Sequence, residues 1–195
     1  KLADSLRIQG LYNDAISEYA RLGPIVMKSP GSPYAKLVEI WPIYCYIKLY
    51  ESYSKAALKD ARYKAPAGKI FNTAMQAVKK LDEKPPARQT NEYSLYKLIR
   101  ALLRVQYARQ FEQGGNELKA AEFYRQSVLE VTEGSVRARV RLDWRPESLL
   151  RACDAYEKLT LNEAAINVYK QVSIFYKGSK WAVESKKRLD ALPAS

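Results

Sequence analysis

The sequence predicts an all-α protein made of antiparallel helical hairpins. Apolar residues recur at steps of three and four, short clusters of Gly, Pro, Ser and Asn interrupt this pattern, and hydrophobic residues make up 47% of the 195 residues. Such steps place apolar side chains on one face of a helix. Short connections favour antiparallel neighbouring helices, and the apolar share excludes a disordered chain.

Residues 1–28 predict two helices that Gly10 separates. The second helix has one apolar stripe, made of Leu11, Ala15, Ile16, Tyr19 and Leu22. Residues 29–33, Ser-Pro-Gly-Ser-Pro, form a strong breaker. Ser32 is expected to cap the next helix, with Pro33 in its first position, where a missing N–H costs nothing.

Residues 33–90 are expected to hold degenerate or elongated helical hairpins. Aromatic residues on several faces of the first helix predict burial on more than one side; they are Trp41, Tyr44, Tyr46, Tyr50 and Tyr53. These rings either form the core between hairpins or line a peptide groove. Pro42 is expected to kink or split this helix. An amphipathic helix follows, and Lys84-Pro85-Pro86 ends it.

Residues 91–132 predict a hairpin with a long helix from Asn91 to Gln113, a turn at residues 114–116 and a shorter helix. Residues 132–135, Thr-Glu-Gly-Ser, are expected to break the chain. From Val136 to Trp144 apolar residues alternate with Arg, so strand and helix patterns compete. A short helix is favoured, because no second strand exists for pairing. Residues 146–177 predict the clearest hairpin, and residues 179–192 a capping helix.

Residues 146–177 resemble a tetratricopeptide repeat (TPR). The matching positions are Leu149, Ala152, Cys153 and Tyr156 in the first helix and Ala165, Tyr169 and Val172 in the second. Two further segments match the repeat in part. Ala15 and Tyr19 in one segment, and Ala120 and Tyr124 in the other, align with Ala165 and Tyr169. The interval from Ala15 to Ala120 is close to three repeat periods of roughly 34 residues, whereas the interval from Ala120 to Ala165 is not a whole number of periods. The resemblance implies a single TPR-like right-handed solenoid over residues 1–195.

A narrower resemblance involves the segments 29–36 and 177–182. Both look like the turn and next helix of bacterial envelope TPR members, such as the outer-membrane assembly lipoproteins and the Tol-Pal-associated periplasmic coordinator. Those members share the pattern Tyr-Pro-x-Ser-x-Tyr/Trp-Ala, in which Met27-Lys28 and Tyr176-Lys177 replace Tyr-Pro here. No lipidation cysteine opens the chain, and residues are expected upstream of Lys1, which starts inside a helix.

Composition excludes several classes of chemistry. The chain has no histidine and no Cys-x-x-Cys pair, which removes Ser-His and Cys-His nucleophiles, imidazole metal sites and thiolate zinc sites. No pattern marks a carboxylate enzyme, so we expect no enzyme, no cofactor and no metal. Cys45 and Cys153 are either bridged or small buried thiols, and the second interpretation is favoured. No apolar run approaches the roughly 20 residues of a transmembrane helix.

The charge balance favours anionic partners. Lys and Arg number 33 against 21 Asp and Glu, giving a net charge of +12. The densest basic run is a candidate anion site and consists of Arg137, Arg139, Arg141, Arg145 and Arg151. Trp144 could stack there on a base. The alternative is a solvated basic face, since no nucleic-acid module signature accompanies the run.

Repeat arrays bind partners along the surface lined by the first helix of each hairpin. The residues expected on that surface are Leu102, Val105, Arg109, Glu147, Leu150, Asp154 and Glu157. We therefore expect a non-catalytic scaffold in a bacterial envelope assembly. Its expected partners are protein subunits or peptides that have acidic surfaces. The expected location is the periplasm or outer-membrane periphery, with the cytoplasm as the alternative. The alternative function is binding of nucleic acid or another anionic polymer through the Arg137–Arg151 run.

Overall fold

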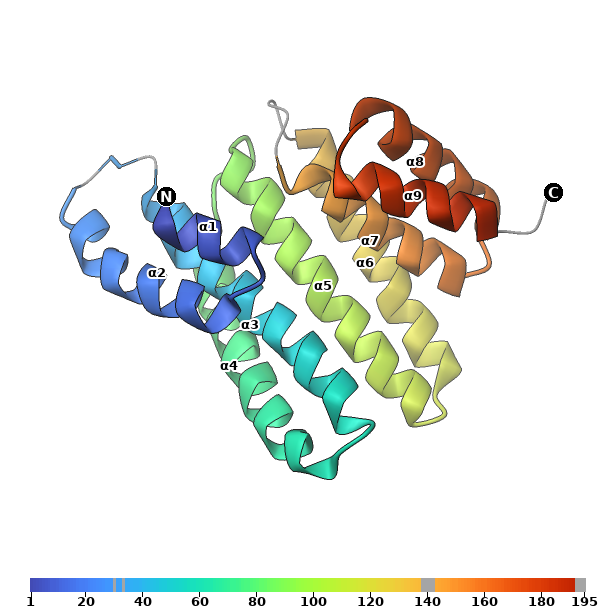
Figure 1. The fold of residues 1–195 in the computed structure, drawn as a ribbon, viewed down its shortest axis with the longest axis horizontal. Helices are drawn as coiled ribbons and strands as arrows, with labels where there is room; N and C mark the ends of the chain where they lie inside the picture. The colour runs from blue at the N-terminus through green and yellow to red at the C-terminus, as the bar shows by residue number, and fades with distance from the viewer. Residues whose placement is uncertain (30, 33, 138–142, 192–195) are drawn as a thin grey trace. The chain divides into compact units, whose positions relative to one another are not determined.

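The computed structural model describes residues 1–195 except 30, 33, 138–142 and 192–195. Within these residues the chain is all-α, as expected, and contains no strand. Within each of its two units, successive helices pack against their neighbours in sequence, as in helical-repeat proteins. The helices, drawn in Figure 1, form two compact units, Lys1–Ala87 and Arg88–Ser195.

In the first unit, each helix packs on the one before it. The elements are α1 (Leu2–Ile8), α2 (Tyr12–Met27), α3 (Ala35–Ala57), the short 3₁₀ helix η1 (Ala61–Tyr63) and α4 (Lys64–Glu83). In the second unit, α5 and α6 form a long hairpin, and α7, α8 and α9 follow in a sequential stack (Figure 1). Their bounds are α5 (Asn91–Gln113), α6 (Glu117–Arg137), α7 (Arg145–Lys158), α8 (Asn162–Phe175) and α9 (Lys180–Ala191).

Three hairpins share one corner geometry, in the register that the sequence predicts. Each corner begins at a residue with positive φ, which is Gly10, Gly115 or Thr160. The next residue donates its N–H to a carbonyl five positions earlier, at 2.8–2.9 Å. Five residues after the positive-φ residue comes a buried alanine, and four residues later a buried tyrosine. These are Ala15 and Tyr19, Ala120 and Tyr124, and Ala165 and Tyr169.

The tyrosine of each corner hydrogen-bonds back to the first helix of its own hairpin. Tyr124 donates to Glu112 Oε2 at 2.9 Å and Tyr169 donates to Glu157 Oε1 at 2.5 Å. Tyr19 occupies the same position but accepts from Arg7 Nε at 3.3 Å. A charged residue twelve positions before the tyrosine is therefore its partner in all three hairpins. Burial and the carboxylate hydrogen bond raise the pKa of Tyr124 and of Tyr169, so both phenols remain protonated donors.

Replacing Ala165 with leucine is expected to cost roughly 1–3 kcal/mol of folding free energy. Ala165 is fully buried where α7 and α8 meet, and its carbonyl accepts from the Cys153 thiol at 3.7 Å. The extra carbons have no space there without displacing one helix. Thermal or urea unfolding measures the effect, and Ala164→Leu, at the half-exposed neighbouring position, is the control. Equal stability of the two variants would contradict the corner packing.

Two sequence-based boundaries differ from the structure. The predicted break at residues 132–135 is wrong, because α6 continues to Arg137. The reason is packing: a Cβ added to Gly134 would lie 2.8 Å from Lys97 Cβ, so the glycine permits a close helix contact. Ser32 also does not cap α3, which begins at Ala35 after Tyr34, and Pro33, the predicted first position, lies outside the described residues. Most of the segment from Val136 to Trp144 lies outside the described residues.

The aromatic residues of α3 pack mainly inside the first unit. Pro42 does not split α3, which is continuous around it. Trp41 and Tyr44 are buried with ring centroids 5.4 Å apart, and Arg7 stacks 3.5 Å above the Trp41 ring. Cys45 is a free thiol buried beside them. Burial raises its pKa to about 12, so the thiol is unreactive at neutral pH.

The α5–α6 contact contains a buried ion network. Lys97 Nζ donates to Glu130 Oε2 at 2.6 Å and lies 2.7 Å from Glu133 Oε2. Arg100 Nε donates to the other Glu130 oxygen at 2.7 Å, and Tyr93 donates to Glu133 at 2.5 Å. Burial acts to lower the pKa of Lys97, but the hydrogen bonds to both glutamates outweigh it and raise that pKa. The side chain is therefore charged at neutral pH.

Candidate functional site

The second unit carries a charged groove between α7 and α9, which we call the α7–α9 groove. Its volume is about 320 Å³, and its lining residues are Leu150, Arg151, Asp154, Lys180, Trp181, Glu184 and Arg188. The floor includes Leu150, which is buried with Cys153, Ala165 and Tyr169. The corner at Thr160 joins α7 to α8, and α9 packs on α8, so both walls of the groove belong to one packed set of helices.

Asp154 joins the two walls of the groove. It accepts from Arg151 Nη1 at 3.0 Å, on its own helix, and from Arg188 Nη1 on α9. Arg188 also donates to Glu184 Oε1 at 2.8 Å and to the Tyr169 hydroxyl at 3.1 Å. Burial would lower the pKa of Arg188, but its hydrogen bonds to Asp154 and Glu184 raise it. These partly buried charges are held in place before any ligand arrives.

Lys180 differs from the two arginines of the groove. It is exposed, and its ammonium nitrogen lies 4.7 Å from the centroid of the Trp181 ring. Among the side chains that the structure describes, no carboxylate forms an ion pair with Lys180, while Asp154 and Glu184 are already paired with arginine. The groove can therefore offer a ligand one solvated cation, an indole face and an apolar floor.

Two of the seven predicted partner-binding residues line the groove, and two more lie on the same helix, α7, outside the lining. Leu150 and Asp154 line the groove. Glu147 is buried, 3.6 Å from Arg151 Nη2, and Glu157 accepts from Tyr169. On α5, by contrast, Leu102 and Val105 are buried in the core, and Arg109 is half-exposed.

The α9 wall was missed by the sequence interpretation, which treated this helix only as a cap. Lys180, Glu184 and Arg188 recur every four residues, so they share one helix face, and this spacing could have indicated a charged wall.

The predicted arginine run lies only partly within the described residues. Arg139 and Arg141 lie outside those residues, and Arg137 is the last residue of α6. Arg145 begins α7 and is half-exposed. Arg151 is 18% exposed and pairs with Glu147 and Asp154, so two carboxylates of its own helix, α7, balance its charge.

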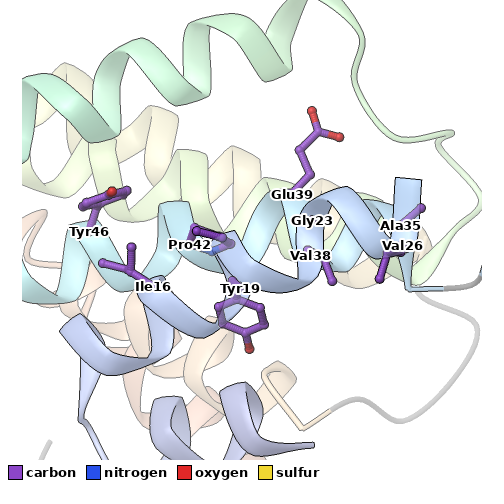
Figure 2. A pocket seen from close by; sticks show the side chains of 10 residues that line it. Ile16, Tyr19, Gly23, Val26, Ala35, Val38, Glu39, Pro42 and Tyr46 are labelled. Carbon is purple, nitrogen blue, oxygen red and sulfur yellow. The ribbon is translucent and has the colours of Figure 1, made fainter. Parts of the chain in front are cut away.

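A second groove lies in the first unit, between α2 and α3, with a volume of about 280 Å³. Figure 2 shows Ile16 and Tyr19 of α2 beside Pro42 and Tyr46 of α3. Its lining is almost entirely apolar, and Glu39, at its rim, is paired with Lys36 at 2.8 Å. Binding sites combine apolar walls with a few placed polar groups that orient a ligand. The α7–α9 groove meets this description better.

None of the described helices has both the length and the apolar character that crossing a bilayer requires. In comparisons with known proteins, no family model matches the chain and no curated protein matches it.

Proposed function

We propose that this protein is a non-catalytic scaffold of the TPR type that binds an extended segment of a partner protein in the α7–α9 groove. The observation that carries this proposal is the set of fixed groups there. Leu150 and the Trp181 ring supply apolar contact, and Lys180 supplies a cation without a carboxylate partner among the described residues. A partner segment with an acidic side chain next to an apolar one fits this arrangement.

The repeated corner supports membership of the TPR type. Three hairpins place a small residue and then a tyrosine at the same distance from their turns, at the positions on which the resemblance rests. Small residues let two helices approach closely, which is the physical basis of stacked hairpins. The alternative function, binding of nucleic acid through the Arg137–Arg151 run, has no comparable support, because Arg151 is ion-paired within α7.

We also propose a cellular context for the protein. It would be a subunit or adaptor of a bacterial envelope assembly, in the periplasm or at the outer-membrane periphery. The turn segments at residues 29–36 and 177–182 support it through their resemblance to envelope members. Fractionation of the native cells by osmotic shock tests this part separately. Recovery with cytoplasmic markers would contradict the location and leave the groove to be tested by itself.

The groove is tested by selecting short random peptides on the immobilised protein and measuring their affinities by fluorescence anisotropy. The selected peptides should carry Asp or Glu beside an apolar residue. Lys180→Glu should weaken their binding by about tenfold or more, because it reverses the cation facing the acidic side chain. Lys186→Glu, an exposed lysine of α9 outside the groove, is the matched control. Peptides that bind both variants equally would place the binding surface elsewhere.

A further inference from the structure

The turn between α8 and α9 forms a hairpin tip, residues 174–183, with the sequence Ile-Phe-Tyr-Lys-Gly-Ser-Lys-Trp-Ala-Val. Figure 1 shows α8 and α9 running in opposite directions on either side of this turn. Ile174 and Phe175 end α8 and are 70% and 65% exposed, and Val183, in the first turn of α9, is 68% exposed. Three large apolar side chains are thus exposed within ten residues, on two helices that pack together.

The charge around the hairpin tip is of one sign. Residues 164–183 contain Lys170, Lys177 and Lys180 and no acidic residue. The three lysines are exposed, and none of them pairs with a carboxylate among the residues that the structure describes. The first acidic residue beyond the tip, Glu184, accepts from Arg188 at 2.8 Å, so its charge is already balanced. The tip is therefore an apolar point surrounded by lysines.

We propose that the hairpin tip binds the surface of a membrane that contains anionic phospholipids. Aromatic and aliphatic side chains at a turn can enter the boundary between headgroups and acyl chains, where Phe, Tyr and Trp are favoured. Lysines at the same depth pair with anionic headgroups and add about 1 kcal/mol each. A protein partner would have to offer an apolar surface for Phe175 and negative charges for three lysines at once. An anionic bilayer offers an apolar interior and negatively charged headgroups over its whole surface.

The membrane is favoured over nucleic acid by the aliphatic residues. A polyanion would use the lysines and could stack on Phe175, but it has no contact to offer Ile174 and Val183. Burial of these side chains in a bilayer is favourable, because it removes apolar surface from water. The tip shares Lys180 and Trp181 with the lining of the α7–α9 groove, whereas Ile174, Phe175, Val183, Lys170 and Lys177 lie outside that lining.

Co-sedimentation of the full chain with vesicles tests the inference. The protein should bind vesicles of phosphatidylcholine mixed with phosphatidylglycerol, and bind vesicles of pure phosphatidylcholine at least tenfold more weakly. The double variant Ile174→Ser/Phe175→Ser should bind the mixed vesicles about tenfold or more weakly. Lys170→Gln/Lys177→Gln should lose about fivefold per lysine and become less sensitive to salt. Lys180 is left unchanged, so that failure of the peptide groove and failure of the tip can be distinguished.

Leu129→Ser is the matched control, because Leu129 is 67% exposed on α6, away from the tip. It should bind the mixed vesicles like the unchanged protein, and melting curves should show that all variants remain folded. Equal binding to both kinds of vesicle, or no binding to either, would overturn the inference. So would tight binding to RNA that depends on Lys170 and Lys177 and is unaffected by the Ile174→Ser/Phe175→Ser change, since the tip would then be a polyanion site.

Discussion

Replacing Lys97 with methionine should lower the free energy of unfolding of the second unit by about 3–5 kcal/mol. Lys97 neutralises two glutamates, Glu130 and Glu133, at the α5–α6 contact. Methionine fills a similar volume but removes the ion pairs that Lys97 forms with Glu133 and with Glu130, and Glu130 then keeps its pair with Arg100. Glu130 is only 10% exposed, and breaking an ion pair of a carboxylate that is largely removed from water costs far more than an exposed ion pair contributes.

Urea unfolding followed by far-UV circular dichroism measures this loss. Lys158→Met is the control in the same unit, because Lys158 is 52% exposed and pairs with Glu112 at 2.9 Å. Its cost should be about 0–1 kcal/mol. Adding Glu133→Gln to Lys97→Met should recover part of the lost stability, since it removes a charge that has lost its ion pair with Lys97. Similar costs for the two lysine variants would show that the network contributes little.

The Gly134→Ala variant should destabilise the same contact by about 1–3 kcal/mol. Alanine is the better helix former by about 1 kcal/mol, so local propensity alone predicts the opposite sign. The added methyl group would lie 2.8 Å from Lys97 Cβ and 3.4 Å from the Ser94 carbonyl oxygen. Neither is the end of a flexible side chain, so α6 would have to move away from α5 and stretch the ion pairs of Lys97.

Gly68→Ala provides the comparison for Gly134→Ala. Gly68 lies inside α4, and a Cβ added there meets nothing within 4 Å. This variant should therefore gain about 0.4–1 kcal/mol, because alanine restricts the unfolded chain. Stability changes of opposite sign for the two Gly→Ala substitutions would show that the two glycines have different roles. A stabilising effect at Gly134 would contradict the close approach of the two helices.

The sequence predicts local structure here better than it predicts contacts. The bounds of α5 agree with the prediction from Asn91 to Gln113, because a threonine side chain accepts from Tyr93 N–H at one end and Gly114-Gly115 turns the chain at the other. Gly134 was misread because a glycine that breaks a helix and a glycine that admits a neighbouring helix look alike in sequence. The partner that distinguishes them, Lys97, lies on another helix.

The same limit applies to the candidate site. Leu150 and Asp154 were predicted from the register of one hairpin, which local spacing determines. Their link to Arg188 spans 34 residues and depends on how α9 packs beside α7. Lys97 and Glu130 are 33 residues apart and depend in the same way on the α5–α6 register. A charge pattern on one helix therefore indicates a polar face, but only the packed structure gives its partner.

The hairpin corners have a consequence for the order in which the chain folds. Each corner tyrosine reaches a partner only twelve residues earlier, so a corner can close before any other hairpin exists. Contacts between residues near in sequence need little loop-closure entropy, and chains rich in them fold in microseconds to milliseconds. During synthesis at roughly 5–20 residues per second, each corner therefore has ample time to form before the next hairpin leaves the ribosome. Within each unit, the apolar face of a finished hairpin is then the surface on which the next helix assembles, so that growth of each unit follows the direction of translation.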